Sequence, residues 1–201
     1  MGLIGAGGRG RYVLSALLAQ PDTQVRAVCD VFRERREDAR HLVNQGYGTE
    51  DCSAYLDMLE LLDRGDIDVV AIATGDNWHS GVSIIAARAG KDMYLEKPMA
   101  ITVEDCDRMI TASKKAGKHL SIGYRLHFEP YNLEMARCGT KQVFGKINKL
   151  SGGFGFRAGP SQWRLTQKYA GGGPLMDVGI YVIQGFCYTT GMEPVAVTAQ
   201  E

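Results

Sequence analysis

The feature that most constrains this sequence is a glycine-rich turn close to its first residue. Gly5, Gly7 and Gly10 form a G-x-G-x-x-G pattern where a short apolar segment, 2–5, ends and a predicted helix over 9–20 begins. The first glycine allows a tight turn, the second lets the backbone approach a pyrophosphate, and the third allows close helix packing. The helix N-terminus also favours an anion. The pattern therefore predicts a strand–turn–helix unit that binds a dinucleotide, with an ordinary structural turn as the alternative.

Strand-sized apolar segments alternate with helical patterns through the first part of the chain. Further strands are predicted over 25–29, 67–73, 93–95 and 119–122, and further helices over 33–45, 55–63, 80–89 and 103–116. Such alternation is typical of parallel βαβ units. We therefore expect an α/β fold, in which residues 1–123 form a doubly wound parallel sheet of about six short strands.

The pattern changes after Gly123. We expect a helix over 133–137, a strand over 145–156, a long polar loop over 155–173, a helix over 174–190 that ends at Gly191, and a strand over 195–200. Because a sheet of two strands is marginal by itself, we interpret residues 124–201 as the beginning of a truncated α+β sheet domain. On this interpretation the chain is a fragment that lacks part of its first strand and much of its second domain.

Charge and cysteine content narrow the choice of partners. Lys plus Arg and Asp plus Glu are 23 each, so the formal net charge is zero. This balance gives no excess of positive charge of the kind that binds nucleic acid or an anionic membrane surface. No apolar run approaches the roughly 20 residues of a membrane span. The five scattered cysteines form no CxxC pair, so we expect neither disulfides nor a metal site. We expect a cytoplasmic protein, with periplasmic export as the alternative.

An acidic residue stands where a dinucleotide-binding unit would place one. Asp30 ends the second predicted strand, 20 positions after Gly10, and could accept hydrogen bonds from the adenosine ribose. Its charge would repel a ribose 2′-phosphate, which favours NAD over NADP. Arg33, Arg35 and Arg36 support the opposite interpretation, because any of them could pair with that phosphate, although arginines on a helix commonly form a solvated face.

Two further groups of residues are candidates for chemistry. Lys97 follows a short strand, so it would lie at the carboxyl edge of the sheet, and the proline after it disfavours a helical backbone. Asp177 and Tyr181 are four residues apart on a predicted helix, which would place both on one face. The alternatives are a surface lysine, a helix-capping aspartate and a packed tyrosine.

The order of these motifs resembles the Gfo/Idh/MocA oxidoreductases, and most of all their glucose–fructose oxidoreductase branch. The matching segments are 5–10, 73–74 through 78–79, 96–98, 123–125, 163–164 and 171–181. Two departures stand out. Thr74-Gly75-Asp76 replaces a common Thr-Pro-Asn, and Tyr181 replaces a common histidine, as it does in the glucose–fructose oxidoreductase branch.

The resemblance implies that residues 1–123 are a Rossmann domain. It also implies hydride transfer between NAD, or less favourably NADP, and a carbon of a sugar or polyol. Tyr181 would move the hydroxyl proton, Lys97 would stabilise its phenolate, and Asp177 would orient the substrate or the lysine. The implied cofactor-binding residues are Gly5, Gly7, Gly8, Arg9, Gly10, Asp30, Thr74, Trp78, His79, Glu96, Lys97 and Arg125. The implied substrate-binding residues are Lys97, Trp163, Arg164, Asp177 and Tyr181.

Several alternatives remain open at this point. His79 could instead be a satisfied histidine at a helix start, and Trp163 a packed loop residue. Some relatives of this family are glycosidases that oxidise a sugar transiently with a tightly held NAD. A non-catalytic sensor is a third class, although a sensor has no need of Lys97, Asp177 and Tyr181 together. The resemblance also implies a homo-oligomer.

Overall fold

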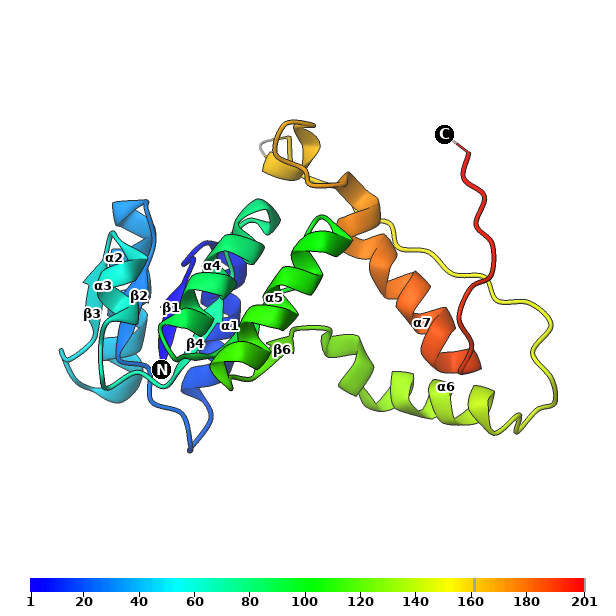
Figure 1. Ribbon diagram of the computed structural model, residues 1–201, viewed down its shortest axis with the longest axis horizontal. Coiled ribbons are helices and arrows are strands. Elements are labelled where there is room, and N and C mark those ends of the chain that lie inside the picture. The colour runs from blue at the N-terminus through cyan, green and yellow to red at the C-terminus, as the bar shows by residue number, and fades with distance from the viewer. Residues whose placement is uncertain (161, 201) are drawn as a thin grey trace. The chain divides into compact units, whose positions relative to one another are not determined.

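A parallel sheet of six strands forms the centre of the first part of the chain. The computed structural model describes residues 1–160 and 162–200, and the chain divides into unit 1, Met1–Gly123, and unit 2, from Tyr124 onward. The sheet of unit 1 has the order β3-β2-β1-β4-β5-β6 (Figure 1). The strands are β1 (Gly2–Ile4), β2 (Ala27–Cys29), β3 (Ser53–Tyr55), β4 (Val69–Ile72), β5 (Asp92–Leu95) and β6 (Leu120–Ile122).

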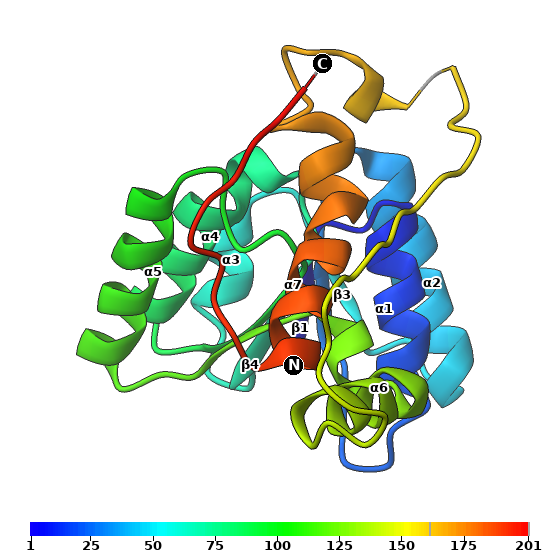
Figure 2. The ribbon, with the colours of Figure 1, turned by 90° about the vertical axis from the view of Figure 1, so that its right-hand side faces the viewer.

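Helices cover both faces of this sheet. They are α1 (Gly8–Leu18), α2 (Arg33–Tyr47), α3 (Met58–Leu62), α4 (Asp76–Arg88) and α5 (Val103–Ala116). One apolar cluster joins the sheet to α1 and α2 through Leu14 and Val43, and a second joins it to α3, α4 and α5 through Leu61, Ala86 and Met109. Figure 2 shows these two groups of helices on opposite sides of the strands. The predicted doubly wound α/β fold is confirmed.

Local sequence explains where several helices begin and end. The Thr102 side chain accepts a hydrogen bond from Asp105 N at 3.1 Å, so it caps the N-terminus of α5. This helix ends at Gly117 in the left-handed region, with φ of +64°, a conformation that glycine adopts without steric cost.

Strand β3 replaces part of an expected helix. The predicted helix over 55–63 is wrong in its first residues, because Ser53–Tyr55 pairs with Ala27–Cys29 of β2. Helix α3 starts only at Met58, after Asp57 caps Leu59 N at 2.9 Å. Three residues are too few to show an alternating pattern, so the strand is recognisable only from its pairing partner.

The regular elements of unit 2 are helices and helical turns in the residues that the structure describes. It contains a 3₁₀ turn η1 (Arg125–Phe128), helix α6 (Pro130–Thr140), a 3₁₀ turn η2 (Trp163–Leu165), a π-helical turn η3 (Leu175–Gly179) and helix α7 (Ile180–Thr190). Gly191 ends α7 as expected, with φ of +67°. Within residues 1–160 and 162–200, no helix combines the length and apolar character needed to cross a membrane.

Two expectations for unit 2 need correction. The segments 145–156 and 195–200, expected as strands, are irregular. A strand persists only where another strand satisfies its backbone groups, and none is available in the described part of unit 2. The expected helix over 174–190 is not uniform, because Asp177 lies in the π-helical turn η3 and Tyr181 lies in α7. The regular four-residue spacing of an α-helix therefore does not hold between these two side chains.

Candidate functional site

The glycine-rich turn lies where the strand order of the sheet reverses. Strand β1 pairs with β2 on one side and with β4 on the other. The connections that leave the carboxyl ends of β1 and β4 run in opposite directions from this point. Gly5 has φ of +91°, and a Cβ on it would lie 2.7 Å from the backbone of Ala73 and Thr74. A Cβ on Gly10 would lie 1.9 Å from Gly5 O. Both positions therefore require glycine for the close contact among β1, α1 and β4.

The other two glycines of the turn face open space. A Cβ on Gly7 would meet only Arg35 Nη1, at 3.9 Å, and a Cβ on Gly8 would meet nothing within 4 Å. Gly8 is the first residue of α1. Its backbone N–H therefore lies at a helix N-terminus, where anions are favoured. The turn thus forms a surface that a pyrophosphate could approach closely.

Asp30 is tied directly to this turn. Its Oδ2 accepts a hydrogen bond from Ala6 N at 2.8 Å, and its Oδ1 accepts one from Phe32 N at 2.8 Å. The residue is 8% exposed. Because a carboxylate has about four lone-pair directions, these two bonds leave acceptor capacity for a ribose hydroxyl. The contact holds the end of β2 against the glycine-rich turn.

Two arginines of α2 lie near the glycine-rich turn and the backbone of Asp30. Arg35 stacks on the Phe32 ring at 4.3 Å from its centroid and also comes close to Gly7, as described above. Arg36 Nη1 donates to Asp30 O at 3.3 Å. The structure thus brings both a negative and a positive group to the place where the ribose 2′ position is expected.

Glu96 directly follows β5 and is almost entirely buried. Its side chain is 4% exposed, and Oε1 lies 2.7 Å from Arg9 Nη2 in an ion pair that links β5 to α1. A Cβ on Gly123 would lie 2.7 Å from Tyr94 Oη and 3.3 Å from Glu96 Oε1. A side chain at position 123 would therefore displace the Tyr94 hydroxyl. The motif at 123–125 did not reveal this contact, because it depends on a neighbouring strand.

His79 lies inside unit 1, between the ends of β4 and β5. It is 1% exposed, with Nδ1 2.6 Å from Pro98 O and Nε2 3.2 Å from Thr74 O. Burial lowers the pKa of His79, although its hydrogen bonds with the Pro98 and Thr74 carbonyls oppose the effect. Both ring nitrogens therefore contact backbone.

Other expected residues of unit 1 lie around the same edge. Lys97 follows Glu96 directly, is half-buried, and is joined to Pro98 by a cis peptide bond. The Thr74 hydroxyl is buried and has no hydrogen-bond partner among the described residues. Trp78 is exposed on the first turn of α4. Asp76, also in that turn, is buried, so the departure at 74–76 does place an acid at this edge.

The remaining expected residues belong to unit 2. Arg164 Nε lies 3.3 Å from Asp177 Oδ1, and the Arg164 guanidinium stacks on the Trp163 ring at 4.2 Å. Tyr181 contacts Tyr124 edge to face, with ring centroids 6.1 Å apart. Arg125 lies in η1. Within unit 2, the structure therefore brings together Trp163, Arg164 and Asp177.

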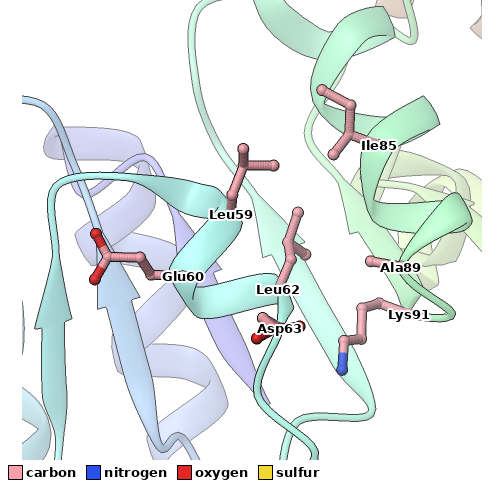
Figure 3. A pocket seen from close by; sticks show the side chains of 7 residues that line it. All are labelled: Leu59, Glu60, Leu62, Asp63, Ile85, Ala89 and Lys91. Carbon is pink, nitrogen blue, oxygen red and sulfur yellow. The ribbon is translucent and has the colours of Figure 1, made fainter.

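The hollow in Figure 3 lies away from the expected site residues of unit 1. It has a volume of about 540 Å³ and is lined by residues of α3, α4 and the turns after them. Lys91 lines it and precedes β5, whereas Lys97 follows β5, so the hollow lies at the amino edge of the sheet. Lys91 Nζ donates to Arg64 O at 2.7 Å and Ile67 O at 2.8 Å. These bonds give Lys91 a structural role.

The residues at the carboxyl edge fit a dinucleotide. Open space lies over Gly7 and Gly8, the Thr74 hydroxyl needs a partner, and Asp30 retains acceptor capacity. Each property is what a bound pyrophosphate and ribose would use. No group of three or more His, Cys, Asp or Glu in the described residues could hold a metal ion.

Comparisons with known proteins agree with this geometry. Residues 1–124 match the oxidoreductase family described as having an NAD-binding Rossmann fold, and residues 133–201 match the GFO/IDH/MocA C-terminal domain. The chain is 30% identical over 187 residues to trans-1,2-dihydrobenzene-1,2-diol dehydrogenase of Danio rerio. The aligned segment covers 91% of this chain and 53% of that protein. It is 29% identical over 158 residues to glycosyl hydrolase family 109 protein 1 of Bacteroides thetaiotaomicron, covering 77% of this chain and 34% of that protein.

Solved structures show the same likeness. Aldose-aldose oxidoreductase from Caulobacter crescentus, complexed with glycerol, superposes with a TM-score of 0.78 and 32% identity over 96% of this chain and 58% of that one. A 3-ketoreductase from Actinomadura kijaniata, in complex with TDP-benzene and NADP, superposes with a TM-score of 0.75 and 27% identity. The match covers 92% of this chain and 54% of that one. The chain spans about half the length of these structures. With a Rossmann sheet, a glycine-rich turn at its switch point and both sequence matches, the chain belongs to the Gfo/Idh/MocA oxidoreductase family.

Proposed function

We propose that the protein oxidises or reduces a sugar or polyol with NAD. The observation that carries this proposal is the convergence of the glycine-rich turn, Asp30 and the Glu96–Lys97 turn at one edge of the sheet, where its strand order reverses. When bound, the nicotinamide accepts or donates the hydride at C4. The sugar oxidoreductase among the similar structures supports the substrate class.

Three side chains are proposed to handle the proton and the substrate. In the oxidative direction, Tyr181 takes the proton of the substrate hydroxyl as the carbinol carbon loses its hydride and becomes a carbonyl. A phenol with its ordinary pKa near 10 is a weak base at neutral pH, so a nearby cation is needed to stabilise the phenolate. Lys97 supplies that charge. Asp177, paired with Arg164, orients the substrate hydroxyl or the lysine.

The test is to follow the absorbance of reduced nicotinamide while purified protein is incubated with NAD and a panel of sugars and polyols. We expect reduction of NAD with at least one member of the panel. Tight NAD binding without reduction by any sugar or polyol would contradict a dehydrogenase, and it would favour the sensor if no aglycone were released from an aryl glycoside either.

A second candidate function has an observation of its own. A relative with 29% identity is a glycosyl hydrolase family 109 protein. A glycosidase that uses NAD transiently would release the aglycone from an aryl glycoside without accumulating reduced nicotinamide, so the two readouts separate the two functions.

Replacing either proposed acid–base residue should remove most turnover. We expect Lys97→Met and Tyr181→Phe each to lower kcat by about 10²–10⁴-fold and to leave NAD affinity nearly unchanged. The double variant should be little worse than either single one if the two groups act as a unit. Steady-state kinetics and calorimetry check this. Full turnover by Tyr181→Phe would remove tyrosine from the mechanism, and additive losses would show independent roles.

A further inference from the structure

The turn that carries Lys97 is held on both sides of that residue. On the preceding side, the buried Glu96 carboxylate lies 2.7 Å from Arg9 Nη2. On the following side, Pro98 O lies 2.6 Å from His79 Nδ1. Because its two neighbours are fixed to α1 and α4, the backbone of Lys97 has little freedom to move.

The His79 ring also joins this turn to the next strand of the sheet. Its Nε2 lies 3.2 Å from Thr74 O, which follows β4, while Pro98 follows β5. These strands are neighbours in the sheet. The ring is 1% exposed, and both of its nitrogens contact carbonyl oxygens. It is therefore placed to fix one turn against another rather than to contact a ligand through a ring nitrogen.

The two contacts of the ring differ in length, and the shorter one is made by the nitrogen that faces the Lys97 turn. A neutral imidazole has one N–H donor. The donor and acceptor roles of the two ring nitrogens depend on the tautomer, and in the Nδ1–H tautomer the ring donates to Pro98 O across the shorter contact of 2.6 Å. Nδ1–H then carries the link to the Lys97 turn, and Nε2 faces Thr74 O at the longer 3.2 Å.

We propose that His79 is a positioning residue, whose Nδ1–H bond to Pro98 O holds the Lys97 amine at the carboxyl edge of the sheet. The proposal rests on the proposed function, in which Lys97 stabilises the phenolate of Tyr181. It replaces the expectation that His79 contacts the cofactor. A displacement of about 1 Å in a catalytic group can lower a rate about 10²-fold, so a residue that acts only through the Lys97 turn can still control turnover.

Three substitutions of His79 separate this role from simple packing. The amide nitrogen of His79→Asn can stand in for Nδ1, that of His79→Gln can stand in only for Nε2, and His79→Leu fills space without a donor. Asn44→Leu is the matched control. Asn44 is buried in unit 1, and its Oδ1 accepts from Cys52 N at 3.0 Å on a different side of the sheet. Its loss should destabilise the unit without touching the Lys97 turn.

The first readout is the rate at which acetic anhydride acetylates Lys97, measured by mass spectrometry below the unfolding transition of every variant. We expect His79→Leu and His79→Gln to raise this rate several-fold, and His79→Asn and Asn44→Leu to leave it at the wild-type value. The second readout is kinetic. His79→Leu should lower kcat by about 10²-fold with the NAD dissociation constant unchanged, and His79→Asn should restore most of the loss.

The outcomes distinguish this proposal from the proposed function. A wild-type Lys97 labelling rate in His79→Leu would overturn the positioning role, and so would equal increases in His79→Leu, His79→Asn and Asn44→Leu. Weakened NAD binding in His79→Leu, together with an unchanged Lys97 labelling rate, would instead indicate that His79 contacts the cofactor. If Lys97→Met keeps full turnover, the proposed function fails, while the labelling rates still decide whether His79 positions the turn.

Discussion

At the scale of single residues, Asp30 has a structural role and is also proposed to bind the ribose of the cofactor. Its two oxygens accept hydrogen bonds from Ala6 N and Phe32 N, which fixes the glycine-rich turn against β2. The remaining lone pairs can accept from ribose hydroxyls. A negative charge at this place is compatible with a ribose hydroxyl and unfavourable for a phosphate. Arg35, which lies close to Gly7, carries a positive charge that would instead favour a ribose 2′-phosphate.

We expect the protein to bind NAD more tightly than NADP. Asp30→Asn removes the charge and keeps one acceptor, so the ratio of the NADP and NAD dissociation constants should fall, while Arg35→Ala should raise it. Isothermal calorimetry with both nucleotides measures these ratios. Tighter binding of NADP by the unchanged protein, lost in Arg35→Ala, would contradict the assignment.

His79 should make stability depend on pH. Burial lowers its pKa in the folded protein, so below the ordinary value of about 6.5 the unfolded chain binds the proton more readily. The stabilising effect of neutral His79 is thus complete above that value and decreases as the pH falls toward the folded pKa. Asp76 and Glu96, which favour the charged ring, reduce the effect without reversing it.

The measurement is urea unfolding between about pH 7 and pH 5 for the wild type and for His79→Asn. We expect the wild type to lose more free energy of unfolding over this range than the variant does. Parallel curves for the two proteins would show that His79 does not titrate differently in the folded and unfolded states.

At the scale of elements, the connection from β1 to α1 separates two uses of glycine. Gly5 and Gly10 make room for backbone, because a Cβ on either would collide with a neighbouring main chain. Gly7 and Gly8 instead leave space on the outer surface of the turn. The first pair serves the packing of α1 on the sheet, and the second pair is proposed to leave room for the pyrophosphate.

This separation predicts different effects for two similar substitutions. Gly10→Ala should lower the free energy of unfolding by more than about 2 kcal/mol, because its methyl group would meet Gly5 O. Gly7→Ala should change stability by less than about 0.5 kcal/mol, since φ of −66° suits alanine, and should weaken NAD at least about tenfold. Urea unfolding and calorimetry measure both. Equal stability of the two variants would contradict the prediction.

At the scale of the whole molecule, buried apolar side chains are distributed unevenly between the two units. Both apolar clusters lie in unit 1, between Leu3 and Met109. In the described part of unit 2, the buried apolar residue is Ala170, and the segment 141–160 is largely irregular and exposed. Unit 1 therefore has the core needed for independent folding, because burial of apolar surface is the main favourable contribution to stability.

Limited proteolysis should expose this asymmetry. We expect trypsin to cut first after Lys146, Lys149 or Arg157, all exposed in the irregular segment, and to leave a resistant N-terminal product that contains unit 1 and still binds NAD. Mass spectrometry and fluorescence titration identify the product and its affinity. Early cleavage within α1 to α5 at the same rate would contradict an independent core.

Much of unit 1 follows from its sequence alone. The glycine spacing from Gly5 to Gly10, Asp30 after β2 and the alternating apolar segments predicted the doubly wound sheet, because each is a local pattern tied to backbone geometry. The same patterns indicated a nucleotide site at the carboxyl edge. The family match confirms an NAD-binding Rossmann fold.

Only the tertiary structure decided the features that depend on segments far apart in the chain. Strand β3 exists because β2 pairs with it, whereas 145–156 is irregular without a partner among the described residues. The His79 link between Thr74 and Pro98, and the Arg9–Glu96 pair, arise from side chains of separate elements. Hydrogen-bond pairing and burial depend on which residues are neighbours in space, so they cannot be predicted from local sequence spacing.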